Sequence, residues 1–160
     1  MNLPIQAKTV LPHRGKMMLI DTVVAAEEGT GTAITDLPSK PIAQTSEGNI
    51  HTPFYIELVA QTYAAVCGYN FLKQRMPIPE GYLVGVQRFE IHQGKNNTDS
   101  HELIISVKTI GDFDGFAVVE GVVTRGNSVV AEGKIKVFVP QDSQTVPLIT
   151  QSTELEQTIQ

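Results

Sequence analysis

The sequence is poor in cysteine, because Cys67 is its single example. One cysteine cannot close an internal disulfide, and no second thiolate is present to complete a cysteine metal site. Residues 1–20 lack the apolar core of a signal peptide, and no apolar run approaches the roughly 20 residues that cross a bilayer. These absences predict a cytoplasmic protein in a reducing compartment, without a membrane span.

Basic residues are also few. Twelve Lys and Arg stand against seventeen Asp and Glu, which gives a formal net charge of -5. No overall positive field is available to attract phosphates, so the composition argues against nucleic acid as a partner. The chain has no glycine-rich phosphate loop, and its histidines and carboxylates do not recur at the spacings typical of metal ligands. We therefore predict no cofactor and no bound metal.

Apolar residues make up 41% of the 160 residues, which is enough for one packed domain. Short and partly β-branched apolar segments between turn residues predict strands. These segments are residues 17–26, 29–37, 82–92, 102–110, 116–124 and 129–139. The first two are expected to form a hairpin and the last four an antiparallel meander. Residues 140–160 are polar and predict a tail of low order, so the domain spans residues 1–139.

One long helix is predicted between the two groups of strands, from about residue 52 to residue 75. Thr52 is the expected N-cap and Pro53 the first helical residue, where its missing N–H costs nothing. Small residues along the helix, such as Gly68, allow another backbone to come close. Before the helix, residues 38–51 show neither a helical nor a strand periodicity of apolar residues, so we expect a loop. Long loops of this sort are often functional.

Two strands, one helix and four strands predict an α+β domain, because a single helix covers only one face of an antiparallel sheet. The simplest packing is the hotdog fold, a curved antiparallel sheet of about six strands wrapped round one long central helix. Such a sheet leaves an exposed edge strand, which a second copy of the chain can pair with. We therefore expect a dimer at least.

Two residues near the start of the helix are candidates for catalysis. Glu57 is the only carboxylate in the helix and has apolar neighbours in the segment PFYIELVAQ. It either faces water or is buried, and a buried carboxyl group can donate or accept a proton near neutral pH. His51 lies just before the helix, whose unpaired N–H groups stabilise polarised oxygens. His13 is instead expected to have a structural role, holding the chain where it enters the first strand.

The segments LPHRGKMMLID, followed by Val, and IELVAQ resemble those of 3-hydroxyacyl-(acyl carrier protein) dehydratases. The segment GYLVGVQRFEIH is similar to the smaller branch of these hotdog enzymes that is associated with aryl polyene and related lipid pathways. The resemblance extends from about residue 11 to residue 139. It implies a hotdog dimer that removes water from a 3-hydroxyacyl thioester on acyl carrier protein, with active sites at the dimer interface.

The resemblance also implies a histidine and a carboxylate as the acid-base pair. Glu57 matches the carboxylate on the helix of the family. The family's histidine lies in an upstream His-Phe-Pro-Gly motif, and the matching region here, SKPIAQTSEGN, contains no histidine. His51 is therefore the candidate substitute. The expected substrate-binding residues are Thr52, Phe54, Gln61 and Arg88.

Three functions stay open at this point. The first is a dehydratase of thioesters carried on acyl carrier protein or coenzyme A. The second is a hotdog acyl thioesterase, in which Glu57 activates water or attacks the acyl carbon and no upstream histidine is needed. The third is a non-catalytic subunit that completes an active site in a heterodimer with a related hotdog chain.

Two further expectations concern basic residues. Arg88 either pairs with Glu90, as a strand arginine often does, or supports the wall of the active site. An acyl carrier protein is acidic, so a chain with net negative charge needs a local basic cluster to dock it. Lys73 and Arg75, at the end of the helix, are the predicted docking pair.

Overall fold

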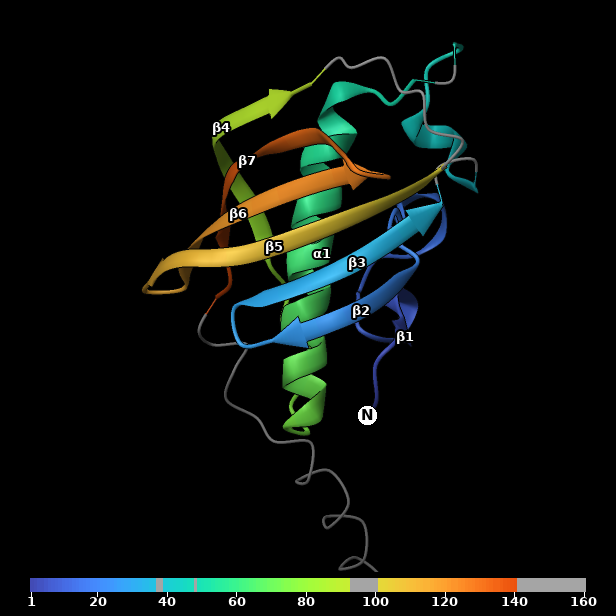
Figure 1. The fold of residues 1–160 in the computed structure, drawn as a ribbon. Coiled ribbons are helices and arrows are strands. Elements are labelled where there is room, and N and C mark those ends of the chain that lie inside the picture. Colours follow the sequence, from blue (N-terminus) through green and yellow to red (C-terminus); the bar gives the residue numbers. More distant parts are fainter. Residues whose placement is uncertain (37–38, 48, 93–100, 141–160) are drawn as a thin grey trace, which may run out of the picture.

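The computed structural model describes residues 1–36, 39–47, 49–92 and 101–140. Within these residues, seven strands and one long helix form the fold (Figure 1). The elements are β1 (Ile5–Gln6), β2 (Thr22–Glu27), β3 (Thr30–Asp36), α1 (Thr52–Lys73), β4 (Tyr82–Ile91), β5 (Glu102–Phe113), β6 (Phe116–Arg125) and β7 (Ser128–Phe138). Short 3-10 helices lie outside the sheet: η1 (Ala7–Thr9), η2 (Gly15–Met17) and η4 (Pro41–Ala43).

The described strands form one antiparallel sheet with the order β1-β2-β3-β5-β6-β7-β4. The predicted hairpin of β2 and β3 is confirmed, and β5, β6 and β7 form a meander. The prediction for β4 is wrong, because β4 pairs with β7 and not with β5. After α1, the chain therefore enters the sheet at the edge opposite β1. The sheet has one strand more than the predicted six, since the two residues of β1 are too short to show a period.

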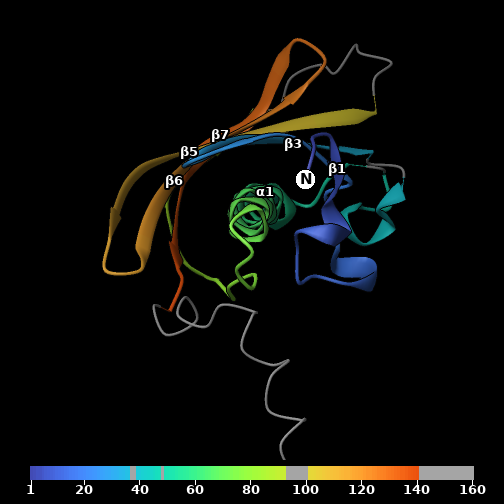
Figure 2. The same cartoon turned by 90° about the horizontal axis from the view of Figure 1, so that it is seen from below.

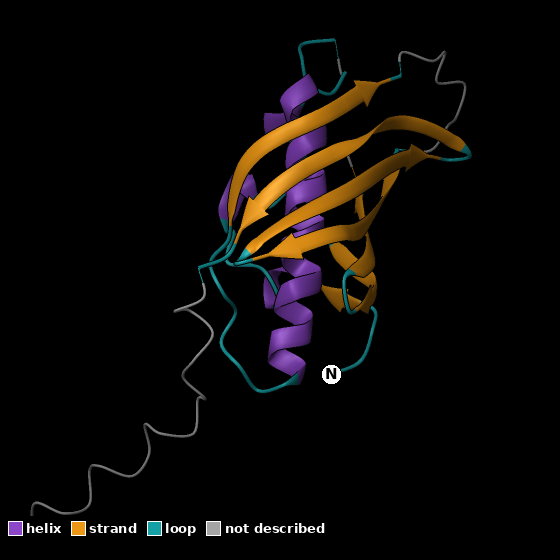
Figure 3. Ribbon diagram, turned by 90° about the vertical axis from the view of Figure 1, so that its left-hand side faces the viewer, coloured by secondary structure: helices purple, strands orange, loops and turns teal. Residues whose placement is uncertain are grey.

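The sheet curves round α1, as the hotdog prediction requires (Figure 2). The strands run obliquely across the helix (Figure 3). Two glycines allow close approach, since a Cβ added at Gly121 would lie 2.3 Å from the Val59 side chain, and one added at Gly68 would lie 2.0 Å from the Val10 carbonyl oxygen. The predicted role of small helix residues is thus confirmed for Gly68.

The start of α1 differs from the prediction by one residue. His51 is the N-cap and Thr52 is already helical, with Pro53 in the first turn. The His51 backbone N–H donates to the carbonyl of Ala43 at 2.9 Å, and its carbonyl accepts a hydrogen bond from the Phe54 N–H at 2.9 Å. The preceding loop therefore fixes the backbone of His51, which places the helix boundary there.

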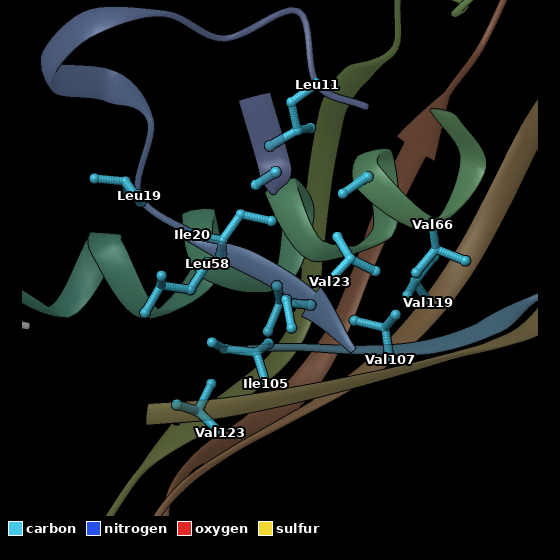
Figure 4. Close-up of a cluster of buried hydrophobic side chains, with 14 of the residues drawn as sticks. Leu11, Leu19, Ile20, Val23, Leu58, Val66, Ile105, Val107, Val119 and Val123 are labelled. Atoms are coloured by element: carbon cyan, nitrogen blue, oxygen red, sulfur yellow. The ribbon is translucent and has the colours of Figure 1, made fainter. Parts of the chain in front are cut away.

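The N-terminal segment between β1 and β2, residues 7–21, packs on α1 before the chain enters β2. The predicted strand over residues 17–26 begins only at Thr22, because η2 and the residues after it cross the helix first. Leu11, Leu19 and Ile20 are buried in the same apolar core as Leu58 of α1 (Figure 4). Burial of each such side chain stabilises the fold by about 1.5–3 kcal/mol. This packing brings the N-terminal segment and the helix together.

Two expectations concern the C-terminal tail and the absence of a membrane span. Beyond Pro140, the predicted polar tail lies outside the described residues. In the part of the chain that the structure describes, no helix is long and apolar enough to cross a membrane.

Candidate active site

A pocket lies beside α1, between the N-terminal segment and the edge of the sheet formed by β4 and β7. Its cavity volume is about 110 Å³. His13 contributes from the N-terminal segment, Glu57 from α1, and Tyr82, Leu83 and Val137 from the strands. The helix residues that line it are Glu57, Ala60, Gln61, Tyr63, Ala64 and Cys67. These positions recur at helical spacing, so one face of α1 lines the pocket along its length.

Glu57 is held in place by Gln61. The Gln61 Nε2 donates a hydrogen bond to the Glu57 Oε1 at 2.8 Å and another to the Met17 carbonyl at 2.7 Å. The Gln61 Oε1 accepts a hydrogen bond from the Leu19 N–H at 2.9 Å. Gln61 is 1% exposed, and its two amide donors and its oxygen are all used. Glu57 is thereby fixed relative to the N-terminal segment as well as to the helix.

His13 also approaches Glu57. The His13 Nε2 lies 3.7 Å from the same Glu57 Oε1 that accepts the hydrogen bond from Gln61. The His13 side chain is 32% exposed and that of Glu57 is 27% exposed. The His13 Nδ1 is buried and has no hydrogen-bond partner among the described residues. A histidine and a carboxylate therefore face one another in a half-buried pocket.

The segment around His13 is anchored on both sides. Val10 and Leu11 before it are buried in the core. The Arg14 guanidinium after it donates to the Leu11 carbonyl at 2.5 Å and to the His13 carbonyl at 2.7 Å. These contacts restrict the backbone that carries the imidazole.

Neutral polar groups occupy the far end of the pocket. The Tyr63 hydroxyl lies close enough to the Cys67 thiol and to Thr109 of β5 to interact with both. Burial raises the pKa of the Tyr63 phenol and the pKa of the Cys67 thiol. Both groups therefore keep their protons at neutral pH. A thiol that keeps its proton is not a reactive thiolate.

The structure places the other predicted site residues elsewhere. His51 and Thr52 are exposed at the start of α1, and the half-buried Phe54 has its ring 6.4 Å from that of His51. Arg88 is exposed on β4 and pairs with Glu90, with a hydrogen bond of 2.7 Å from its Nε. None of these side chains belongs to the described lining of the Glu57 pocket. Of the predicted residues, Gln61 is the one brought into contact with Glu57, and roles for the others in substrate binding stay predictions.

His13 was assigned a structural role from the sequence, and the structure instead places it in the pocket. The available signal was its position in LPHRGKM, inside the segment with a family resemblance. That signal does not give the distance to Glu57, which depends on how the N-terminal segment packs on α1.

The arrangement suits proton transfer at a small, partly enclosed site. An imidazole and a carboxylic acid side by side can act as a base and an acid on neighbouring atoms of one substrate. Across residues 1–36, 39–47, 49–92 and 101–140, no three His, Cys, Asp or Glu side chains converge as metal ligands would.

The chain is similar to known dehydratases. The model of a family described as ApeP-like, ApeP dehydratase, matches residues 5–147. A 3-hydroxyacyl-[acyl-carrier-protein] dehydratase, FabZ, of Thermotoga neapolitana is 30% identical over 133 residues, which cover 80% of this chain and 90% of the relative.

Solved structures share the fold at lower identity. The dehydratase heterocomplex ApeI:P of Xenorhabdus doucetiae contains a chain with a TM-score of 0.76 and 18% identity, and the match covers 92% of this chain and 99% of that one. A hypothetical thioesterase of Streptococcus pneumoniae, crystallised with coenzyme A, has a TM-score of 0.53 and 18% identity, with 73% of this chain and 83% of that one covered.

Proposed function

The chain belongs to the ApeP-like dehydratase family, and from this premise we propose that it converts a 3-hydroxyacyl thioester on acyl carrier protein to the enoyl thioester. The observation that carries the proposal is the approach of His13 to Glu57 in the pocket, at 3.7 Å. Fatty-acid or polyene-type biosynthesis is the setting in which such a dehydration is needed. The match to a whole-length dehydratase relative supports the same reaction.

The proposed reaction needs two proton transfers. The neutral His13 imidazole takes the proton from the carbon next to the thioester carbonyl, and the electrons of that C–H bond form the new double bond. The C–O bond to the 3-hydroxyl group breaks, and the protonated Glu57 supplies the proton with which the hydroxyl leaves as water. The proton on His13 then returns to Glu57, which restores the starting state.

Gln61 prepares Glu57 for this role. Its amide N–H donates to the Glu57 Oε1, so the carboxyl group keeps one orientation. A proton delivered to the departing hydroxyl is then carried by the other oxygen, Oε2. Fixed orientation reduces the entropy lost when the reacting groups align.

We propose that the carrier docks near the N-terminal segment. Arg14 and Lys16 are exposed directly after His13, whereas Lys73 is sixteen residues after Glu57 and so about 24 Å further along the helix axis. A basic pair beside the catalytic histidine is better placed for an acidic carrier than one at the end of the helix.

We propose that a second hotdog chain, identical or related, pairs with β4. This strand is at the edge of the sheet, so one row of its backbone groups has no strand partner among the described residues. Its exposed residues include Tyr82, Leu83, Val84 and Val86. Tyr82 and Leu83 also line the Glu57 pocket, so a partner on this edge would border the active site. The proposal is compatible with either a homodimer or a heterodimer.

One assay separates the proposed reaction from its alternatives. The purified chain is given a 3-hydroxyacyl thioester while enoyl absorbance and thiol release are followed together, beside the Glu57→Gln variant. Enoyl product that depends on Glu57 supports the dehydratase. Thiol release without enoyl product would make the chain a thioesterase, and no product in either channel would favour a non-catalytic subunit.

A further inference from the structure

Three hollows of the molecule meet at the same two residues of α1. Tyr63 and Cys67 both line the Glu57 pocket. They also line a second hollow beside the turn between β5 and β6, and a third beside the turn between β2 and β3. Both side chains are half-buried, so each is covered by protein and still borders these spaces.

The two side chains form a connected wall. Tyr63 and Cys67 are four residues apart, which places them one above the other on the helix. The Tyr63 hydroxyl interacts with the Cys67 thiol and with Thr109 of β5. The phenol ring therefore reaches from the helix to the sheet, and it separates the Glu57 pocket from the hollows beyond.

The pocket between Glu57 and this wall has the shape and polarity of an acyl site. Cys67 is ten residues after Glu57, which corresponds to about 15 Å along the helix axis. Between them the helix presents the methyl groups of Ala60 and Ala64 to the pocket. Short side chains leave room along the helix, and their apolar surface favours a hydrocarbon chain.

We propose that Tyr63 and Cys67 end the acyl pocket and thereby set the longest chain that it accepts. The inference rests on the proposed function, because the reacting carbons must lie at Glu57 for the hydrocarbon tail to point at the wall. A tail that ends before Tyr63 fits in the pocket. A longer tail meets the phenol ring and must displace it, which separates the ring from Cys67 and Thr109.

Space for a longer tail exists behind the wall. The second hollow has a volume of about 380 Å³ and shares Pro79 and Val139 with the Glu57 pocket, in addition to Tyr63 and Cys67. Its further lining includes Phe116 of β6. Asp112 and Asp114 also line this hollow, so removal of the phenol ring would join the two spaces into one longer channel whose far end is partly polar.

The test measures binding as a function of chain length. Unreactive saturated acyl-pantetheine thioesters with butyryl, octanoyl, dodecanoyl and hexadecanoyl chains are titrated calorimetrically into the wild type, Tyr63→Ala and Tyr63→Phe. In Tyr63→Ala, the affinity for the longest chain relative to that for octanoyl should rise about tenfold or more, since even one methylene changes discrimination by roughly 10-fold to 200-fold. Tyr63→Phe keeps the ring and should keep the wild-type preference.

A second variant tests the wall from the other side. Ala64→Leu fills the pocket before the wall, so this variant should prefer shorter acyl chains than the wild type does. Thermal unfolding shows which variants are folded. An unchanged ratio in folded Tyr63→Ala, or, where that variant does not fold, an unchanged preference in Ala64→Leu, would overturn the proposal. A wild type that binds no acyl-pantetheine would do the same.

The binding readout separates this proposal from the proposed reaction, because it requires no turnover. If Tyr63→Ala shifts the chain-length preference but the wild type forms no enoyl product, the proposed dehydration is refuted and the role of Tyr63 and Cys67 in chain length is supported. Enoyl formation with an unchanged preference would refute the wall alone.

Discussion

The His13 Nε2 lies 3.7 Å from the Glu57 Oε1, although His13 belongs to the N-terminal segment and Glu57 to α1. The contact requires that residues 10–19 cross α1 before β2 begins. Gln61 secures this crossing, because it binds Glu57 and the backbone of Met17 and Leu19 at once. The acid-base pair is therefore a product of tertiary packing.

Substitution of either member of this pair should abolish most of the dehydration. We expect His13→Ala and Glu57→Gln each to lower kcat by about 10²-fold to 10⁴-fold, as loss of a general acid or base does. The measurement is the initial rate of enoyl formation. His92→Ala is the matched control, since His92 is exposed directly after β4, contacts Glu132 and does not line the Glu57 pocket.

The same assay decides between His13 and the histidine favoured by the sequence. If His51→Ala removed the activity and His13→Ala did not, the assignment of His13 would be wrong, and the base would have to reach the substrate from the start of α1. The expected order is a far greater loss for His13→Ala.

The sequence predicts much of the fold because its signals are local. The strands and α1 show their periods within a few residues, and the contact of Gln61 with Glu57 follows from helical spacing. The place of β4 is different, because pairing with β7 depends on where the chain leaves α1. Periodicity contains no information on strand order.

The candidate site could also be predicted only in part, because local sequence patterns do not show contacts between distant segments. Glu57 stands out because it is a lone carboxylate among apolar neighbours. His13 does not stand out, since its partner lies on a distant segment and the contact needs Gly68, Val10 and Gln61 to pack as they do. Sequence reasoning preferred His51 because it is near Glu57 along the chain, yet the structure leaves it exposed at the helix start.

Gln61 should act on the reaction through Glu57. We expect Gln61→Ala to lower kcat by about tenfold with a smaller change in KM, because an unheld carboxyl group samples unproductive orientations. It should also destabilise the fold by about 1–3 kcal/mol, since the Leu19 N–H and the Met17 carbonyl lose a buried partner. Steady-state kinetics and urea unfolding measure the two effects.

A double-mutant cycle separates positioning from general damage. In the Glu57→Gln background, Gln61→Ala should have little further effect on kcat, because the group that it positions is no longer an acid. An equal loss in both backgrounds would mean that Gln61 affects activity only through stability.

Charge reversal beside His13 should weaken use of the carrier protein. We expect Lys16→Glu to raise KM a few-fold for a substrate on acyl carrier protein, since an acidic partner is repelled at the rim of the interface. The same substrate on pantetheine alone should be unaffected. Kinetics with the two carriers provide the measurement.

The double variant Lys73→Glu, Arg75→Glu is the matched comparison. A larger effect there than at Lys16 would place docking at the end of α1, as expected from the sequence. It would contradict the position that we propose beside His13.

The buried Cys67 thiol should make stability fall in alkaline solution. Its pKa is raised above the ordinary value of 9.0 by burial, so the folded chain keeps a proton that the unfolded chain loses. The contribution to the free energy of unfolding is fully present below pH 9 and declines as the pH rises above it. Urea unfolding of wild type and Cys67→Ala at several pH values between about 8 and 10.5 tests this, and equal slopes would contradict it.

Gly68 links the stability of the fold to the position of His13. A methyl group at this position would lie 2.0 Å from the Val10 carbonyl oxygen, three residues before His13. We expect Gly68→Ala to destabilise the fold by about 1–3 kcal/mol, as overpacking does, although alanine favours a helix by about 1 kcal/mol over glycine. Since the N-terminal segment must move away from α1, kcat should fall as well.

Gly111→Ala is the control for this substitution, because a Cβ at Gly111 has no heavy atom within 4 Å among the described residues. Urea unfolding and enoyl formation should therefore be close to those of the wild type for Gly111→Ala and reduced for Gly68→Ala. A Gly68→Ala variant with lower stability and unchanged kcat would show that the segment can shift at Val10 without moving His13. Arg14 and Leu11 would then hold the imidazole in place by themselves.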